Sequence, residues 1–246
     1  MKELYYMVII YGKNIIKEAI KAQRKIYVLY INPLMKDKAF LNFIFQSYPN
    51  YCYLDKHQLN SKVQNNNHQG VVAEVQDYFY RKDLLTYLIE KSNKIVKFLI
   101  LDAIQDPHNL GAIIRTVEAS DFDGIIVSKK HQVPLNSTVA KTSSGALEYV
   151  NIFLVCNLYQ TILTLQKFNF IIIGTEIGLD KNIDIIPVEQ SLAIILGNEG
   201  IGMRPLLKKK CNFLVSIPTQ GMVNSLNVSV SAAVIIFYLY MKNKKY

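Results

Sequence analysis

The chain has 246 residues, half of them hydrophobic, and a formal net charge of +9 with a sequence pI of about 9.3. A chain of this length and apolar content can bury a sizeable core, so general disorder is excluded, and its excess of positive charge favours polyanionic partners such as RNA. Charge alone does not establish nucleic-acid binding, because solvated lysines produce the same balance.

The first 77 residues are predicted to form a small α/β unit with mixed strands and helices. The expected elements are a strand or helix start at 11–16, a helix ending at Gln23, a strand over 25–31, a helix over 38–46, and strands over 52–54 and 70–75. Residues 78–95 are rich in charge, and we expect them to be a linker with a short helix, too polar for the core.

From residue 96 onward, apolar runs alternate regularly with helical patterns. The expected strands cover 98–101, 124–128, 150–155, 170–174, 192–196 and 213–217. The expected helices cover 109–120, 137–147, 158–168, 204–211 and the apolar stretch 228–241. This alternation, with strands that are nearly all apolar, predicts an α/β fold with a parallel sheet covered on both faces.

Cysteine usage and the longest apolar run argue against several other classes of protein. Cys52, Cys156 and Cys211 are scattered, with no Cys-x-x-Cys pair and no histidine at ligand spacing, so neither a zinc site nor a disulfide framework is expected. The opening apolar run contains Glu3 and lacks a small-residue cleavage site, which argues against a signal peptide. The stretch 228–241 is too short to cross a bilayer. We therefore expect a cytoplasmic protein with no metal and no membrane attachment.

Three polar segments follow strands of the predicted sheet. They are 101–118 (LDAIQDPHNLGAIIRTVE), 196–202 (LGNEGIG) and 217–229 (IPTQGMVNSLNVS). A strand that passes into a helix through such a segment leaves backbone N–H and C=O groups without local partners, which suits a polar ligand. In open α/β sheets, ligands lie outside the carboxyl ends of the strands. The sequence therefore predicts one ligand site where the three segments meet.

Taken one at a time, these segments have plainer interpretations. Asn109 is placed to cap a helix, and Arg115 could form an ion pair with Glu118, three residues away, instead of serving as a fixed cation beside a reacting oxygen. The glycines around Asn198 could form an ordinary turn. Their order differs from the dinucleotide-binding Gly-x-Gly-x-x-Gly, and the chain has no phosphate-binding Gly-Lys-Ser/Thr loop, so an NAD enzyme or an ATPase has little support.

Together, however, the segments resemble the three signature motifs of the SpoU (TrmH-type) RNA 2′-O-ribose methyltransferases of the SPOUT superfamily. The matching stretches are Asp106-Pro-x-Asn-Leu-Gly-Ala-Ile-Ile-Arg115, Leu196-Gly-Asn-Glu-Gly200 and Ile217-Pro…Asn224-Ser-Leu-Asn-Val-Ser229, in the family's order. In the first part of the chain, Tyr11-Gly-Lys-Asn14 and His68-Gln-Gly-Val-Val-Ala73 resemble the substrate-binding domain of RlmB-like members.

The resemblance implies an RNA-binding domain over 1–77, a linker over 78–95 and a methyltransferase domain over 96–246 that ends in a deep trefoil knot. It also implies a homodimer formed through the knot region, so that the partner supplies part of the active-site wall. The final apolar helix would lie partly in that interface.

The same resemblance implies the site residues. S-adenosylmethionine (SAM) would be held in the knot, largely by backbone atoms around Thr175, Leu196, Gly197, Ile217 and Leu226. Catalysis is assigned to Arg115, with support from Asn109, Glu199, Ser225 and Asn227. A guanidinium stays protonated in proteins, so Arg115 would stabilise the developing 2′-oxyanion rather than accept its proton. The chain departs from the expected small residues after Gly174, where it has Thr175, Glu176 and Ile177.

The RlmB-like layout implies methylation of a guanosine in the large-subunit (23S) rRNA. A tRNA ribose methyltransferase is the alternative within the class. A non-catalytic RNA-binding or ribosome-assembly factor is the alternative of another class, and the intact set of catalytic residues argues against it.

Overall fold

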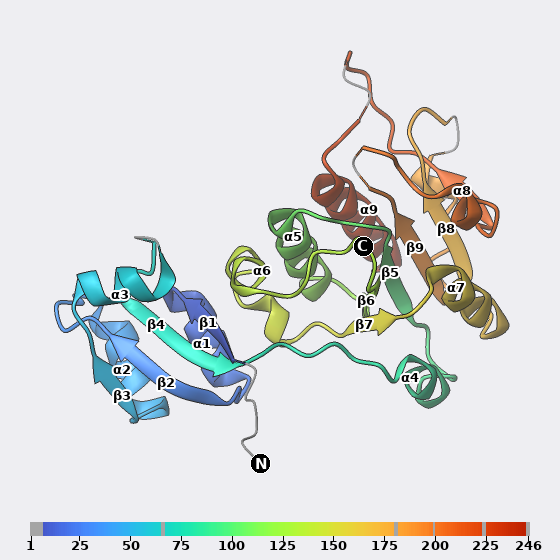
Figure 1. Cartoon of the computed structure of the whole chain (residues 1–246). Coiled ribbons are helices and arrows are strands. Elements are labelled where there is room, and N and C mark those ends of the chain that lie inside the picture. Colours follow the sequence, from blue (N-terminus) through green and yellow to red (C-terminus); the bar gives the residue numbers. More distant parts are fainter. Residues whose placement is uncertain (1–6, 65–66, 180–181, 199, 223–224, 245–246) are drawn as a thin grey trace. The chain divides into compact units, whose positions relative to one another are not determined.

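The computed structural model describes residues 7–64, 67–179, 182–198, 200–222 and 225–244. The chain divides into two compact units (Figure 1), one formed by Met1–Phe79 with Leu135–Tyr149 and the other by Tyr80–Pro134 with Val150–Tyr246. The segment Leu135–Tyr149 thus packs with the N-terminal residues, although its place in the sequence is between two strands of the second unit.

The first unit contains a four-stranded sheet in the order β1-β4-β2-β3. Its strands are β1 (Met7–Tyr11), β2 (Ile26–Ile31), β3 (Tyr51–Tyr53) and β4 (Val71–Gln76). Strand β4 is antiparallel to both β1 and β2, and β3 is parallel to β2. The helices are α1 (Lys13–Lys21), α2 (Lys38–Ser47), α3 (Lys56–Val63), α6 (Ser137–Thr142) and the 3-10 turn η1 (Ala146–Glu148).

A buried polar cluster attaches the segment Leu135–Tyr149 to the first unit. Arg24 Nε lies 2.6 Å from Glu148 Oε2, and the Arg24 guanidinium stacks 4.0 Å from the centre of the Tyr78 ring. The Tyr78 hydroxyl donates to Glu148 Oε1 at 3.0 Å. Burial and the neighbouring Glu148 carboxylate raise the pKa of Tyr78 far above its ordinary value, so this hydroxyl remains a donor.

The second unit contains a six-stranded sheet in the order β10-β8-β9-β5-β6-β7. Its strands are β5 (Lys97–Leu101), β6 (Gly124–Ser128), β7 (Ile152–Val155), β8 (Ile171–Thr175), β9 (Leu192–Leu196) and β10 (Phe213–Val215). Every pair of neighbours is parallel, which confirms the predicted parallel α/β sheet. The helices are α4 (Leu84–Glu90), α5 (Pro107–Glu118), α7 (Leu158–Lys167), α8 (Pro205–Lys208), α9 (Val228–Asn243) and the 3-10 turn η2 (Ile183–Ile185).

Helices cover both faces of this sheet (Figure 1). Successive strand residues point to opposite faces, and on one face Phe98 and Ile100 belong to a core cluster with residues of α4, α7 and α8. Helices α5 and α9 pack against each other on the other face. Among the described residues, no helix is both long and apolar enough to span a bilayer.

Helix α4 differs from the expectation that residues 78–95 are too polar for the core. Leu84, Tyr87 and Leu88 are buried in the same cluster as Phe98 and Phe153. They are spaced i, i+3 and i+4, which places all three on one helical face, while the charged residues around them face solvent. The overall polarity of this stretch concealed that narrow apolar stripe.

The amino ends of the strands in the second unit are joined by hydrogen bonds and ion pairs, which we call the amino-edge network. Asp123 is its centre: its carboxylate accepts from the Lys97 backbone N–H at 2.9 Å and from the Tyr87 hydroxyl at 3.0 Å. The Lys97 ammonium, 3% exposed, lies 2.6 Å from an Asp121 carboxylate oxygen. Asn151 Nδ2 donates to the Asp123 backbone carbonyl at 3.0 Å. Each of these contacts joins two segments of the second unit.

Candidate functional site

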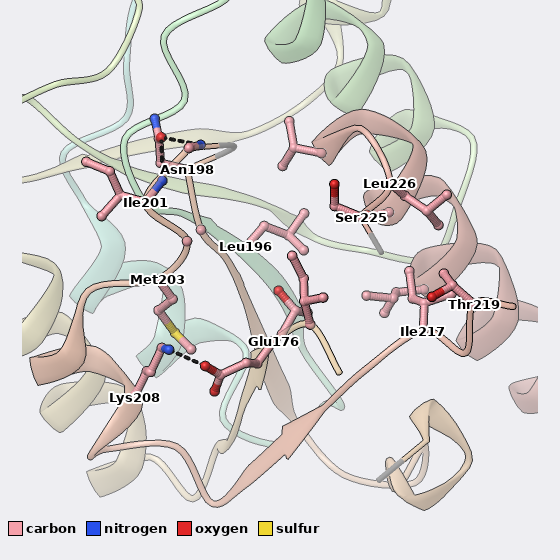
Figure 2. A pocket seen from close by; sticks show the side chains of 18 residues that line it. Glu176, Leu196, Asn198, Ile201, Met203, Lys208, Ile217, Thr219, Ser225 and Leu226 are labelled. Atoms are coloured by element: carbon pink, nitrogen blue, oxygen red, sulfur yellow. Dashed lines mark hydrogen bonds and ion pairs between the residues drawn. The ribbon is translucent and has the colours of Figure 1, made fainter. Parts of the chain in front are cut away.

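A cavity of about 320 Å³ lies at the opposite, carboxyl edge of the six-stranded sheet. Its walls come from the ends of β8 and β9, from the segment after β10 and from the start of α9 (Figure 2). The volume is in the range of small-molecule sites. The second and third polar segments of the sequence therefore do meet in one cavity.

The cavity has walls of mixed character. Figure 2 shows Met203 and the ion-paired side chains of Lys208 and Glu176 on one side, with Ile217 and Leu226 across from them. Apolar side chains of this kind can cover a flat ring system, while the ion pair can exchange its mutual contact for contacts with a charged or hydroxyl-bearing ligand.

The loop after β9 forms a tight hairpin along the cavity. The backbone N–H of Asn198 donates to the Gly202 carbonyl at 3.1 Å, and the Gly202 N–H donates back at 2.8 Å. The Asn198 side-chain oxygen accepts from the Gly200 N–H at 2.9 Å. A Cβ at Gly197 would collide with the backbone of Gly202 and Met203, so the close approach of the two arms requires glycine there.

The residues assigned to the cofactor all lie on this cavity. Its lining includes Thr175, Leu196, Gly197, Ile217 and Leu226. Ser225, assigned a catalytic role, lines it as well. Glu199 lies outside the described residues.

Asn109 and Asn227 bring the first polar segment to the third. Asn227 Nδ2 donates to Asn109 Oδ1 at 3.1 Å, and Asn227 Oδ1 accepts from the Ser229 N–H at 2.9 Å, which caps α9. Asn109 was expected to cap α5, but the cap is Asp106, whose carboxylate accepts from the His108 N–H at 2.8 Å. Helix α5 starts earlier than expected because Pro107 occupies its first position, where the missing N–H costs nothing. Asn109 therefore lies inside the first turn, where its side chain contacts Asn227 at the start of α9.

Arg115 lies in the last turn of α5, with an exposed side chain, and is not among the residues that line the cavity. It is six residues beyond Asn109, which corresponds to about 9 Å along a helix axis. The structure thus brings Asn109 beside the third segment and leaves Arg115 on the surface of the chain.

Two lining residues with charged side chains, Glu176 and Lys208, were not assigned to the site from the sequence. They are 32 positions apart, so spacing could not pair them. One indication of this pair was present in the sequence, which has Glu176 in a stretch after β8 where the family resemblance implies small residues.

Cys211 packs beneath Gly174, and burial raises the pKa of its thiol to about 11, so it is a neutral packing residue rather than a nucleophile. Within the part of the chain that the structure describes, no group of three His, Cys, Asp or Glu side chains could hold a metal ion.

Comparison with protein families gives two matches along the chain. Residues 97–237 match the model described as the SpoU rRNA Methylase family. Residues 9–81 match the model described as RNA 2′-O ribose methyltransferase substrate binding. The two matches together cover most of the chain.

Individual relatives agree with these matches. A Bacillus subtilis (strain 168) protein named as the TrmH family tRNA/rRNA methyltransferase YacO is 36% identical, over 94% of each chain. A crystal structure of an RNA 2′-O ribose methyltransferase aligns with a TM-score of 0.80 at 20% identity, over 98% of this chain and 90% of that one. The SpoU methyltransferase AviRb from Streptomyces viridochromogenes, in complex with AdoMet, aligns with a TM-score of 0.76 at 18% identity, over 97% and 91%.

Proposed function

The chain belongs to the SpoU family of RNA 2′-O-ribose methyltransferases, and from that premise we propose that it methylates the ribose of a guanosine in 23S rRNA with SAM as donor. The main support for this proposal is the cavity at one edge of the parallel sheet, where the residues after β8, β9 and β10 meet.

The residues around the cavity fit SAM. Leu196, Ile217 and Leu226 offer apolar contact to a purine ring, and Glu176 with Lys208 offers charge of both signs to a zwitterionic tail. Backbone groups of the tight loop at Gly197 are close to the cavity with no side chain in the way. When bound, SAM supplies an electrophilic methyl group on a sulfonium sulfur.

We assign the transfer chemistry to residues of the first and third polar segments. Because Arg115 stands outside the cavity lining, we propose that its guanidinium meets the RNA ribose and stabilises negative charge growing on the 2′-oxygen. That oxygen would bond to the methyl carbon as the bond from methyl to sulfur breaks, leaving S-adenosylhomocysteine, and the 2′-hydroxyl proton would pass to a phosphate oxygen or to water. Asn109 and Asn227, bonded to each other, would fix α5 against the start of α9. Ser225 at the cavity wall and Glu199 in the adjacent loop would orient the ribose.

A homodimer is part of this proposal. Helix α9 leaves Val230, Val234 and Met241 exposed, which supports its pairing with a second copy. We propose that the deep trefoil knot lies at the C-terminal end and that the partner completes the active site through this region. Light scattering should give the mass of a dimer. A monomer that retains full activity would contradict the proposal that a partner completes the active site.

The first unit, which contains residues 9–79 of the match to substrate binding, would hold the RNA. Phosphate contacts by its lysines would make RNA affinity fall steeply with added salt. An affinity that does not change between low and physiological salt would contradict this role.

Mapping ribose methylations in cellular RNA, with and without the protein, tests the reaction and its target together. We expect one 2′-O-methylguanosine of 23S rRNA to disappear, and purified protein with SAM to restore it. A mark lost from tRNA would instead support the tRNA alternative. If no mark changes and calorimetry detects no SAM binding, the protein is a non-catalytic RNA-binding factor.

A further inference from the structure

A buried carboxylate stands at the carboxyl end of β5, next to the cavity loop. The Asp102 side chain is 1% exposed and accepts three contacts from one residue, Arg204. The Arg204 backbone N–H donates to Oδ2 at 3.1 Å, Nε donates to Oδ1 at 2.8 Å, and Nη2 lies 2.7 Å from Oδ1. Asp102 is thus the main polar anchor for the end of the loop that follows β9.

A second anchor holds the beginning of the same loop. Asn198 Nδ2 donates to the Ala103 backbone carbonyl at 2.8 Å. Ala103 has φ of +66°, a left-handed conformation that is unfavourable for alanine, and it follows Asp102 directly. Two consecutive residues after β5 therefore contact Asn198 and Arg204, which stand on either side of the cavity-lining residues 200–203.

The hairpin also has its own backbone hydrogen bonds between Asn198 and Gly202, but its described residues bury little apolar surface. Ile201 at its tip is 86% exposed, and Met203 is its buried apolar side chain. Gly200, Ile201, Gly202 and Met203 all line the cavity. A glycine-rich hairpin with an exposed tip loses much conformational entropy on ordering, and its internal bonds do not fix it to β5, which is the part that the polar anchors supply.

We propose that Asp102 and Arg204 are positioning residues for cofactor binding, which act by holding residues 200–203 in the conformation that lines the cavity. This rests on the proposed function, because the ligand is SAM. The apparent affinity of a ligand falls in proportion to the fraction of protein in the competent conformation. Weakening the anchor therefore lowers affinity even though Asp102 does not line the cavity.

Arginine is required at this position because of its geometry. Its planar fork presents Nε and Nη2 together to one carboxylate, which a lysine ammonium cannot reproduce. The Arg204 side chain is 52% exposed, so its substitution opens no large cavity. Because Arg204→Gln leaves the buried Asp102 carboxylate without its cation, cooperative thermal unfolding is measured for each variant, and only folded variants are titrated.

Calorimetric titration with S-adenosylhomocysteine, a stable analogue of SAM, tests the anchor in the full-length chain. We expect Arg204→Gln to weaken binding about tenfold, corresponding to a loop ordered in roughly a tenth of the molecules, and Arg204→Lys to weaken it about threefold. In steady-state assays the KM for SAM should rise while kcat changes less than about threefold. The double variant Asp102→Asn with Arg204→Gln restores a neutral hydrogen-bonded pair and should recover part of the lost affinity.

Lys97→Met is the matched control, because Lys97 forms the buried ion pair at the other end of the same strand. It should lower the melting temperature and leave the affinity for S-adenosylhomocysteine unchanged. If Arg204→Gln behaves like this control, the Asp102–Arg204 pair serves stability alone and the proposal is overturned.

Hydrogen exchange on the ligand-free protein separates failure of this proposal from failure of the proposed function. The Gly202 amide, bonded to the Asn198 carbonyl, should exchange about tenfold faster in Arg204→Gln than in the wild type. Unchanged exchange at Gly202 would refute the anchor whatever the ligand. Wild-type protein that binds neither SAM nor its analogue would refute the proposed function instead.

Discussion

The two edges of the six-stranded sheet both carry polar residues, yet they differ in how those residues are used. At the amino edge, Asp121 and Asp123 are engaged by Lys97 and Tyr87 through contacts within the unit. At the carboxyl edge, the polar groups border a cavity. Polar residues at strand ends can therefore stabilise the fold or bind a ligand, and a cavity beside them distinguishes the second role from the first.

A feature common to both edges is an ion pair at an end of β5. The pair of Lys97 and Asp121 lies at the amino end, and the pair of Asp102 and Arg204 lies at the carboxyl end. Only the second pair reaches into a loop that lines the cavity. Substitutions at the carboxyl edge should therefore lower function, whereas substitutions at the amino edge should lower stability.

The largest effect is expected for Arg115→Ala. Removing a cation that stabilises the developing oxyanion should lower methyl transfer roughly a thousandfold, while the melting temperature and the affinity for SAM stay near wild-type values. Transfer of labelled methyl groups to rRNA at saturating SAM measures the loss. A variant with near wild-type turnover would show that Arg115 has no part in the chemistry.

Gly197→Ala should have the next largest effect, on cofactor affinity. Its Cβ would collide with the backbone of Gly202 and Met203, so the hairpin must open and affinity for SAM should fall roughly a hundredfold.

Gly200→Ala is the matched comparison in the same loop. The added Cβ would meet only the Asn198 side-chain oxygen at 3.5 Å, an ordinary contact, so a much smaller loss is expected. Equal affinities for the two variants, measured by calorimetry, would mean that the shape of the hairpin does not matter.

At the amino edge, Asp123→Asn should lower stability without lowering activity. One of its two carboxylate acceptors would be replaced by an amide N–H₂ group facing the Lys97 N–H or the Tyr87 hydroxyl, at a cost of about 2 kcal/mol in the free energy of unfolding. Urea unfolding measures the cost. Reduced methyl transfer by the folded variant would break the proposed separation between the two edges.

Tyr87→Phe should have the smallest effect, about 1 kcal/mol at neutral pH, because one hydrogen bond to Asp123 is lost. Burial, together with the Asp123 carboxylate, raises the pKa of Tyr87 to about 12. The folded protein therefore holds this proton more tightly than the unfolded chain, whose tyrosine has a pKa of about 10. The stability from this group is present below about pH 10 and is lost as the pH rises toward 12.

The phenylalanine variant lacks the titrating group, so its stability should fall less steeply than that of the wild type over this alkaline range. Parallel unfolding curves for the two proteins between about pH 10 and 12 would show that Tyr87 does not titrate as described.

Strands of the second unit were the most predictable part of the fold. Strands 124–128 and 192–196 were expected with the ends that the structure gives them, because each is an apolar run bounded by polar or turn-forming residues. Helix α3 was not expected, since Leu59 is its buried apolar residue and no stripe marks it. Its readable signal was the capping box formed by Asp55 and Gln58.

The site was predictable where residues are close in sequence to a strand end, and less so where contacts are long-range. Leu196 and Gly197 follow directly from the end of β9. Asp102 and Arg204 are 102 positions apart, and no local pattern relates them. The attachment of Glu148 to Arg24, over 124 positions, escaped prediction for the same reason. Such pairs become visible only when the chain is folded.

Hydrogen exchange with and without S-adenosylhomocysteine shows whether segments far apart in the chain form one cofactor site. We expect slower exchange together at 175–177, 200–203 and 225–231, with no change at the amino ends of β5 and β6. Protection confined to one of the three stretches, or appearing at the amino edge, would contradict a single cofactor site.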